Sequence, residues 1–222
     1  MNAQRVNSEL LTFLITHQVA PGDRLPALPE LADQLGVSVG KLREQLEVAR
    51  HLGLISVRPR HGMRRERFSF LPGVRTSLLF SLASGEGDFQ QFSQLRRIIE
   101  TNLWDEAVVL LAEADKEHLR QLVAKAWEKL RSDPVHIPNG EHRDLHLTIF
   151  SRLDNPFVQG LLQAYWDAYE TIELTRLADL HYWLTVWQYH EQIVEALCAN
   201  DWARGRQLLV EHFDLLPPTW HS

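Results

Sequence analysis

The feature that most constrains the fold of this sequence is a pair of short amphipathic segments separated by one tight turn. Apolar residues recur at helical spacing through 28–35, and the pattern stops at Gly36. It resumes at Val39 behind Ser38, whose hydroxyl can cap a helix by accepting from free backbone N–H groups, and it ends at Gly53. This spacing is typical of a helix-turn-helix, in which the start of the second helix enters the major groove of DNA.

An arginine-rich hairpin is predicted directly after the second helix. Residues 54–59 alternate between apolar and polar as a short strand does, and 63–68 can return as its partner. Five arginines fall within 58–67, where Gly62 allows a tight turn. Because cations that release counterions from phosphates supply the basal affinity for DNA, the hairpin is predicted to be a DNA-contacting wing. We therefore expect a winged helix-turn-helix domain over 1–68.

The rest of the chain is predicted to be helical apart from its turns. A helix is expected over 4–18, and from 77 onward only helical periods recur. Turn-forming residues interrupt these periods near 85–87, 115, 132–140, 155–156, 178–179 and 200–201. The sequence therefore predicts a mainly α protein, in which a linker at 69–76 joins the winged domain to an all-α helical bundle of about six or seven helices over 77–222.

Charge is distributed unevenly along the chain. The net charge is −6, yet the first 75 residues carry more lysine and arginine than aspartate and glutamate, so only the N-terminal domain is expected to meet a polyanion. No segment approaches the roughly 18–20 apolar residues of a membrane span, and the N-terminus lacks the apolar core of a secretory signal. Cys198 is the single cysteine, which suits a reducing compartment, and a cytoplasmic protein is expected.

The candidate DNA contacts come from the start of the second helix and from the hairpin. They are Ser38, Val39, Lys41, Arg43, Arg58, Arg60, His61 and Gly62. If about three arginines per subunit reach phosphates, the log–log salt dependence of a dimer would have a slope of roughly −5. A run of charge is otherwise a solvated face, and the preceding helix-turn-helix spacing is what favours the DNA contact.

Four histidines fall on apolar helical faces of the second domain. His142 and His146 are four residues apart and share one face, while His190 and His212 each lie among aliphatic residues of a different helix. A buried imidazole needs partners for both nitrogens, and a metal can take one while a nearby acceptor takes the other. A lone histidine on such a face is more often a hydrogen-bonded core residue. The residues alone leave both interpretations open.

The N-terminal segment "PGDRLPALPELADQLGVSVGKLREQLEVARHLGLISVRPRHG" resembles the DNA-binding domain of GntR-family bacterial transcription regulators, over roughly 4–67. Pro29 and Val39 stand where the family often has DNA-contacting arginines. This departure leaves Arg43 and the hairpin as the main arginine contacts, and it puts the usual operator sequence of the family in doubt. Val39 could instead touch a thymine methyl group.

The region from about 77 to 216 resembles the FCD effector domain of the FadR subgroup of that family. The resemblance is carried by "LRRIIE" (95–100), by "HLTIFSRLDNP" (146–156) and by the spacing of the last two histidines. It implies that the helices bring an aspartate and three histidines together around a divalent metal, with a small carboxylate effector nearby. Carried over by position, the three histidines are His146, His190 and His212.

His142 stands where the resemblance places the aspartate ligand. Asp144 is a poor substitute because it lies about 200° round the helix from His142. Three outcomes are open: His142 is a fourth nitrogen ligand, the site has three histidines, or metal binding is lost. Imidazole suits zinc, nickel, copper and iron, of which zinc or nickel is the first expectation. Arg96 is the candidate partner for an effector carboxylate, and its alternative role is an ion pair with Glu100.

The prediction is a bacterial, ligand-responsive transcription regulator, by family habit a repressor, that binds a pseudo-palindromic operator in double-stranded DNA as a homodimer. The alternative from another class is a metal-dependent enzyme that acts on small carboxylates with the histidine cluster. Against an enzyme, the sequence has no H-E-x-x-H helix, nucleophile elbow or glycine-rich phosphate loop. A second rival is a ligand-binding protein whose basic head binds something other than DNA.

Overall fold

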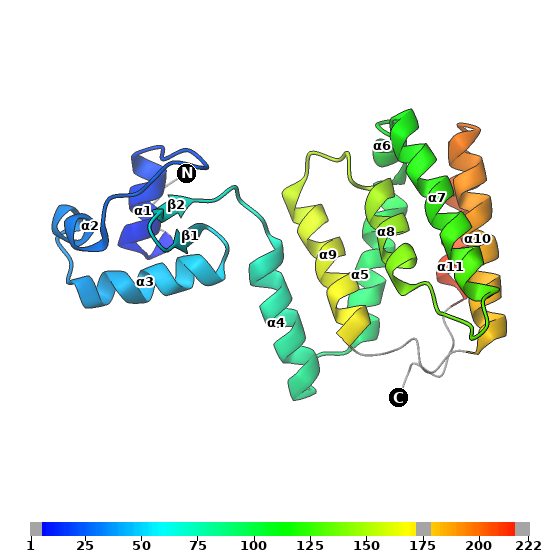
Figure 1. The fold of residues 1–222 in the computed structure, drawn as a ribbon, viewed down its shortest axis with the longest axis horizontal. Helices are drawn as coiled ribbons and strands as arrows, with labels where there is room; N and C mark the ends of the chain where they lie inside the picture. The colour runs from blue at the N-terminus through cyan, green and yellow to red at the C-terminus, as the bar shows by residue number, and fades with distance from the viewer. Residues whose placement is uncertain (1–5, 172–178, 216–222) are drawn as a thin grey trace. The chain divides into compact units, whose positions relative to one another are not determined.

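The structure is a computed structural model that describes residues 6–171 and 179–215 (Figure 1). Parts of the predicted segments lie outside the described residues. They are 1–5 of the winged domain, which include the start of its first helix, and 172–178 and 216–222 of the helical domain, which include residue 178 of one break. The chain divides into two compact units, Met1–Gly73 and Val74–Ser222.

The first unit is a winged helix-turn-helix, as predicted. Its elements are α1 (Glu9–Thr16), α2 (Leu28–Leu35), α3 (Val39–His51), β1 (Ile55–Arg58) and β2 (Gly62–Arg65). Gly36 ends α2 in the left-handed region with a φ of 65°, and the Ser38 hydroxyl accepts from the Lys41 N–H at 3.1 Å. The strands pair antiparallel, with Arg58 opposite Gly62.

One apolar core holds this unit together. Leu10, Leu31 and Leu42, one from each helix, are fully buried at its centre, and Ile55 and Met63 cover it from the hairpin. Because the two strands contribute to the same core as the helices, packing as well as hydrogen bonds fixes the position of the hairpin relative to α3.

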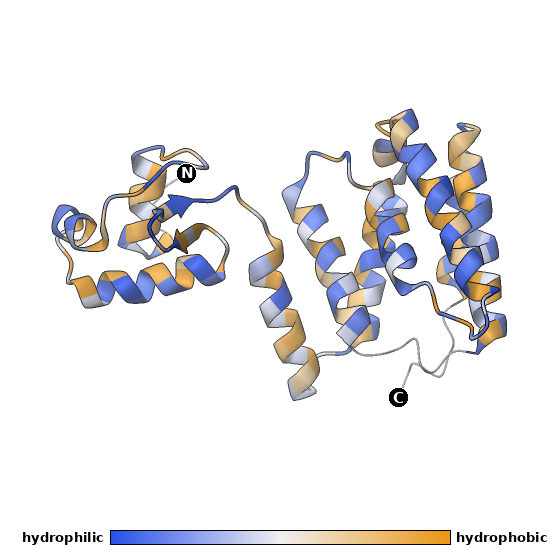
Figure 2. Cartoon of the chain, viewed as in Figure 1, coloured by the Kyte–Doolittle hydropathy of each residue, from blue (hydrophilic) through white to orange (hydrophobic). Residues whose placement is uncertain are grey.

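The remaining elements are all helices within the described residues. They are α4 (Leu71–Ser84), α5 (Phe89–Asn102), α6 (Trp104–Val108), α7 (Glu113–Leu130), α8 (Asn139–Ile149), α9 (Pro156–Thr171), α10 (Leu180–Cys198) and α11 (Trp202–Phe213). The sequence did not predict α6, because five residues are too few to show a helical period. Figure 2 shows hydrophobic and hydrophilic stripes alternating along these helices.

Most of the segment predicted to be a linker, 69–76, is helical, because α4 begins at Leu71. The Ser69 hydroxyl accepts from the Leu71 N–H at 3.3 Å, and the first turn of a helix tolerates Pro72. Proline and glycine therefore lie in the first turn of a helix here, so most of the predicted linker segment is helical. The helix has no buried residue in the described chain, although hydrophobic residues lie along it (Figure 2).

The core of the second unit is rich in tryptophan. Four indoles are completely buried: Trp104, Trp166, Trp183 and Trp187. Helix α10 packs against α7 and α11, α8 packs against α7 and α9, and α5 packs against α9 and α11. These helices enclose a polar centre, described below. Among the described helices, none has the length and apolar character that crossing a membrane requires.

Candidate functional site

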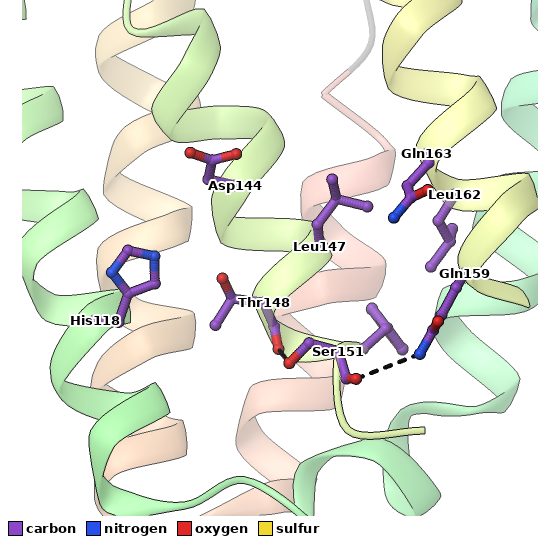
Figure 3. A pocket seen from close by; sticks show the side chains of 9 residues that line it. His118, Asp144, Leu147, Thr148, Ser151, Gln159, Leu162 and Gln163 are labelled. Carbon is purple, nitrogen blue, oxygen red and sulfur yellow. Dashed lines mark hydrogen bonds between the residues drawn. The ribbon is translucent and has the colours of Figure 1, made fainter. Parts of the chain in front are cut away.

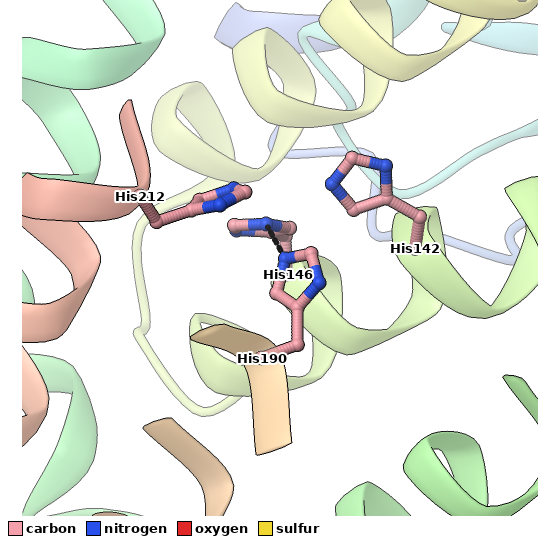
Figure 4. A group of neighbouring side chains, drawn as sticks. All are labelled: His142, His146, His190 and His212. Atoms are coloured by element: carbon pink, nitrogen blue, oxygen red, sulfur yellow. Dashed lines mark hydrogen bonds between the residues drawn. The ribbon is translucent and has the colours of Figure 1, made fainter. Parts of the chain in front are cut away.

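Four histidines from three helices meet in the interior of the second unit (Figure 4). His142 and His146 come from α8, His190 from α10 and His212 from α11, and all four are buried. One nitrogen from each ring lies within 4.8 Å of the corresponding atoms of the other three. The convergence that the residues alone could not establish is therefore present in the fold.

The rings approach closely enough to share one small ligand. The Nε2 atoms of His146 and His190 are 3.1 Å apart, and the His190 and His212 ring centroids are 4.4 Å apart. The His142 centroid lies 4.7 Å from that of His190. In Figure 4 the four rings point toward one another from three helices.

Several nitrogens of this cluster have no hydrogen-bond partner in the described chain. They are both ring nitrogens of His142, Nδ1 of His190 and Nδ1 of His212. An unsatisfied buried polar group costs about 1–3 kcal/mol, and a divalent cation would use imidazole lone pairs directly. The donor set thus fits a divalent metal with a preference for nitrogen ligands, such as zinc or nickel.

Burial also keeps the histidines in the form that binds metal. It lowers the pKa of all four imidazoles well below the usual value, and the nearby charge of Arg96 lowers each pKa further. Neutral imidazole offers a lone pair, whereas imidazolium offers none. Burial therefore keeps the four imidazoles neutral, which is the form in which their lone pairs can bind a metal.

Glu100 on α5 orients one of these histidines. Its Oε2 lies 2.8 Å from Nδ1 of His146, with both side chains buried. A neutral His146 donates from Nδ1 to the carboxylate and so directs its Nε2 lone pair toward His190. Burial raises the pKa of Glu100, while the adjacent guanidinium of Arg96 opposes that shift.

Arg96 makes the ion pair that was its alternative role and keeps a free donor. Its Nε donates to Glu100 Oε1 at 2.7 Å, and its guanidinium lies 4.5 Å from the ring centroids of both Tyr165 and Trp166. Its Nη2 is buried without a hydrogen-bond partner in the described chain. The geometry leaves that N–H group available to an anion beside the histidines.

Asp144 is separate from the histidine cluster, in agreement with its place on the opposite side of the helix. It is exposed and lines a pocket on the outer side of α8 together with His118, Thr148 and Ser151 (Figure 3). In that pocket Gln159 Nε2 donates to the Ser151 carbonyl at 3.4 Å. Asp144 cannot replace the aspartate ligand from there.

The residues at the start of α3 that are expected to contact DNA differ in their exposure and in their contacts within the protein. Ser38 caps the helix, and Val39 is half-buried against the core, which reduces what it can offer to a base. Lys41 pairs with the Glu9 carboxylate of α1, so DNA has to compete with that contact. Arg43 is exposed and forms no ion pair in the described chain, which leaves it the freest cation of this helix.

Four of the five arginines at 58–67 fall into two groups: two are exposed, and two bind backbone carbonyls. Arg58 and Arg60 are exposed with His61 beside the turn. Arg64 Nη1 donates to the Gly22 carbonyl at 2.7 Å, and Arg65 Nη1 donates to a carbonyl of the same loop. These last two fasten the wing to the loop before α2, which leaves fewer cations for phosphates than the composition suggested.

The tip of the wing is tightly turned and approached by one further arginine. Arg60 and Gly62 have φ angles of 65° and 75°. A Cβ on Gly62 would lie 3.2 Å from Nε of Arg24, an exposed residue of the loop before α2. The sequence reasoning missed this cation because its proximity to the wing depends on the fold.

A basic winged helix-turn-helix combined with a helical body that encloses a polar centre defines a DNA-binding regulator with a sensory domain. The FCD domain family matches residues 91–215, and the family described as bacterial regulatory proteins, gntR family, matches residues 2–64. The chain belongs to the GntR family and carries a C-terminal FCD domain. It is a transcription regulator and not an enzyme, and regulators of this family bind DNA and typically act as dimers.

Similar proteins support this assignment. The HTH-type transcriptional regulator YcbG of Bacillus subtilis is 26% identical over 211 residues, which span 95% of this chain and 86% of that protein. The HTH-type transcriptional repressor NanR of Escherichia coli is 25% identical over 228 residues, spanning 99% and 84%. A GntR protein of Streptococcus agalactiae shares the fold with a TM-score of 0.66, at 17% identity and 96% coverage of both chains.

Proposed function

We propose that this regulator is a homodimeric repressor of the bacterial cytoplasm that senses a small organic acid through a divalent metal held by its histidine cluster. The observation that carries the proposal is His142, which is buried against three other histidines with neither ring nitrogen hydrogen-bonded in the described chain. A core histidine would be expected to find at least one protein partner.

The four histidines would act as metal ligands, with zinc or nickel preferred by an all-nitrogen set. When bound, the metal would supply a positive charge that attracts the carboxylate of the effector. Glu100 would hold His146 in the ligating tautomer, and the free Nη2 of Arg96 would bind a carboxylate oxygen of the effector. Because this chain has the neutral His142 where related proteins have an aspartate, its metal centre would carry one more positive charge than theirs.

The DNA-binding part of the proposal places Arg43, Arg58 and Arg60 against phosphates or base edges, with Ser38, Lys41 and the wing tip nearby. Two copies of the recognition helix would read a pseudo-palindromic operator. Effector binding can change DNA affinity only if the two arrangements of the heads differ in their affinity for the effector. Repression is favoured over activation because the relative NanR is named a repressor.

The proposal is tested by fluorescence anisotropy on a duplex selected from a random DNA pool with the purified protein. The zinc-loaded protein is titrated at several salt concentrations, with and without a panel of small carboxylates, and compared with protein stripped by a chelator. Salt-dependent binding that a carboxylate alters only in the zinc-loaded protein is the expected result. DNA binding that responds to carboxylates equally after removal of the metal would contradict the role of the metal.

A further inference from the structure

The histidine cluster is surrounded by hydrogen-bond donors that nothing in the described chain satisfies. We infer that the effector is rich in acceptor oxygens, and that the indole N–H groups of Trp166, Trp183 and Trp187 recognise those oxygens. The inference rests on the proposed function, because it takes the histidine cluster to be the effector site. It adds the class of ligand and the residues that select it.

The three indoles belong to one neighbourhood. Their ring centroids lie 4.7 Å, 6.1 Å and 6.3 Å from that of His142, for Trp166, Trp183 and Trp187 respectively. All three side chains are completely buried, and the Nε1 of each has no hydrogen-bond partner in the described chain. A buried indole N–H normally finds an acceptor, so three unsatisfied ones around a single imidazole call for a common explanation.

Arg96 adds a fourth donor to the same place. Its guanidinium lies 4.5 Å from the Trp166 ring centroid, and that ring also lies 5.3 Å from His146. Arg96 and Trp166, each with one unpaired donor nitrogen, therefore lie together beside His146. Guanidinium and indole are both donors without acceptor capacity, so only a group that carries an acceptor atom can satisfy them.

Buried acceptors are scarce by comparison. Apart from imidazole nitrogens, the unpaired buried side-chain atoms of the described chain include one oxygen, Oδ1 of Asn139 at the start of α8. A ligand rich in N–H groups, such as an amine, would find little to bind. A ligand with carboxylate, hydroxyl or keto oxygens would satisfy the donors that burial now leaves unpaired, and each bond so formed recovers a desolvation cost.

The test measures affinity by isothermal titration calorimetry on the zinc-loaded full-length protein. The first probe series keeps four carbons and varies only the oxygens: butyrate, succinate, L-malate and tartrate, with 4-aminobutyrate as the amine counterpart. A second pair, hexanoate and gluconate, extends the comparison to six carbons. We expect affinity to rise with oxygen content, by about tenfold for each well-placed acceptor, and 4-aminobutyrate to bind no better than butyrate.

The variants Trp166→Phe, Trp183→Phe and Trp187→Phe keep an aromatic ring but remove the donor. Each should weaken the tightest oxygen-rich probe by about tenfold while leaving the weak binding of its deoxygenated analogue nearly unchanged. Trp127→Phe is the matched control, because Trp127 on α7 also has a buried and unpaired Nε1 but contacts Arg131, the residue that follows this helix. Circular dichroism of each variant checks that the helices are intact.

The outcomes separate this inference from the proposed function. If butyrate binds the wild-type protein as tightly as malate or tartrate, or hexanoate as tightly as gluconate, the inference is overturned and the metal-dependent sensor stands. A fall in affinity that is equal for oxygen-rich and oxygen-poor probes in the tryptophan variants also overturns it, since that result assigns the indoles a purely structural role. If no carboxylate of either series binds, the inference and the proposed effector site fall together.

Discussion

Glu100 and His146 are 46 positions apart in the chain and meet in the core, where a carboxylate oxygen lies 2.8 Å from the imidazole Nδ1. The other oxygen of the same carboxylate accepts from Nε of Arg96 at 2.7 Å. One buried carboxylate thus joins the candidate metal ligand to the candidate effector arginine. In the proposed sensor, a change of charge at either end would alter the electrostatic energy at the other, so this carboxylate would couple metal binding to effector binding.

Removing the charge of this carboxylate should weaken the metal site. The variant Glu100→Gln keeps the size of the side chain but no longer holds His146 through a charged acceptor, so zinc affinity should fall about 10–100-fold. Competition with a chromophoric chelator measures the effect. Glu117→Gln, at an exposed carboxylate paired with Arg120, is the control and should leave zinc affinity unchanged. Equal zinc affinities for wild type and Glu100→Gln would rule out this orienting role.

The imidazole of His142 should strengthen the binding of anionic effectors. In His142→Asp the variant side chain can still ligate a metal, but the net charge of the centre drops by one. Carboxylates should therefore bind the variant at least about tenfold more weakly than they bind wild type. Calorimetric titration of the tightest carboxylate probe checks this. His118→Asp places the same charge on the exposed side of α7 and should change little; tighter binding by His142→Asp would contradict the charge argument.

The exposed arginines of the wing should dominate the salt dependence of DNA binding. Arg58→Ala removes one cation from each copy of a dimer, so the log–log salt slope should become shallower by about 2. Anisotropy titrations at several salt concentrations give the slope. Arg120→Ala removes an exposed arginine of the helical body instead and should leave the slope unaltered. The assignment of the wing fails if Arg58→Ala and Arg120→Ala have the same slope as wild type.

Gly205 of α11 is required by its close packing against Trp104 of α6. A Cβ at this position would lie 2.7 Å from Cζ2 of Trp104, whose Nε1 donates to the Trp202 carbonyl at 2.9 Å and cannot easily shift. Gly205→Ala should therefore lower the free energy of unfolding by about 1–3 kcal/mol despite the better helix propensity of alanine. Gly140→Ala on α8 meets no atom within 4 Å and should be neutral or stabilising. Urea denaturation compares the two, and equal stabilisation of both would refute the packing argument.

The winged head could be predicted closely because its signals are local. Gly36 and Ser38 mark a helix end and a helix start through their own backbone and side-chain chemistry, and both positions behave as expected. The same local rules did not show that most of the predicted linker at 69–76 is helical, with Pro72 in the first turn of α4. Local chemistry alone does not distinguish a proline in a linker from a proline in the first turn of a helix.

The candidate site was harder to predict, because it is formed by contacts between distant parts of the chain. Periodicity showed that His190 faces an apolar interior but not that it meets His146 from another helix, which only the packing of α8 against its neighbours decides. The contact of Glu100 with His146 left no local signal at all. Arg64 likewise counted as a DNA-binding cation by composition, whereas the fold engages it with the Gly22 carbonyl.

The most direct test of the central claim, that the four histidines hold a metal, is the metal content of the protein after incubation with zinc or nickel and removal of the free ion. Elemental analysis should find about one divalent ion per chain in wild type and less than about a tenth of that in His190→Ala, with His118→Ala retaining the wild-type content. Wild-type protein that retains no more metal than His190→Ala would contradict the claim.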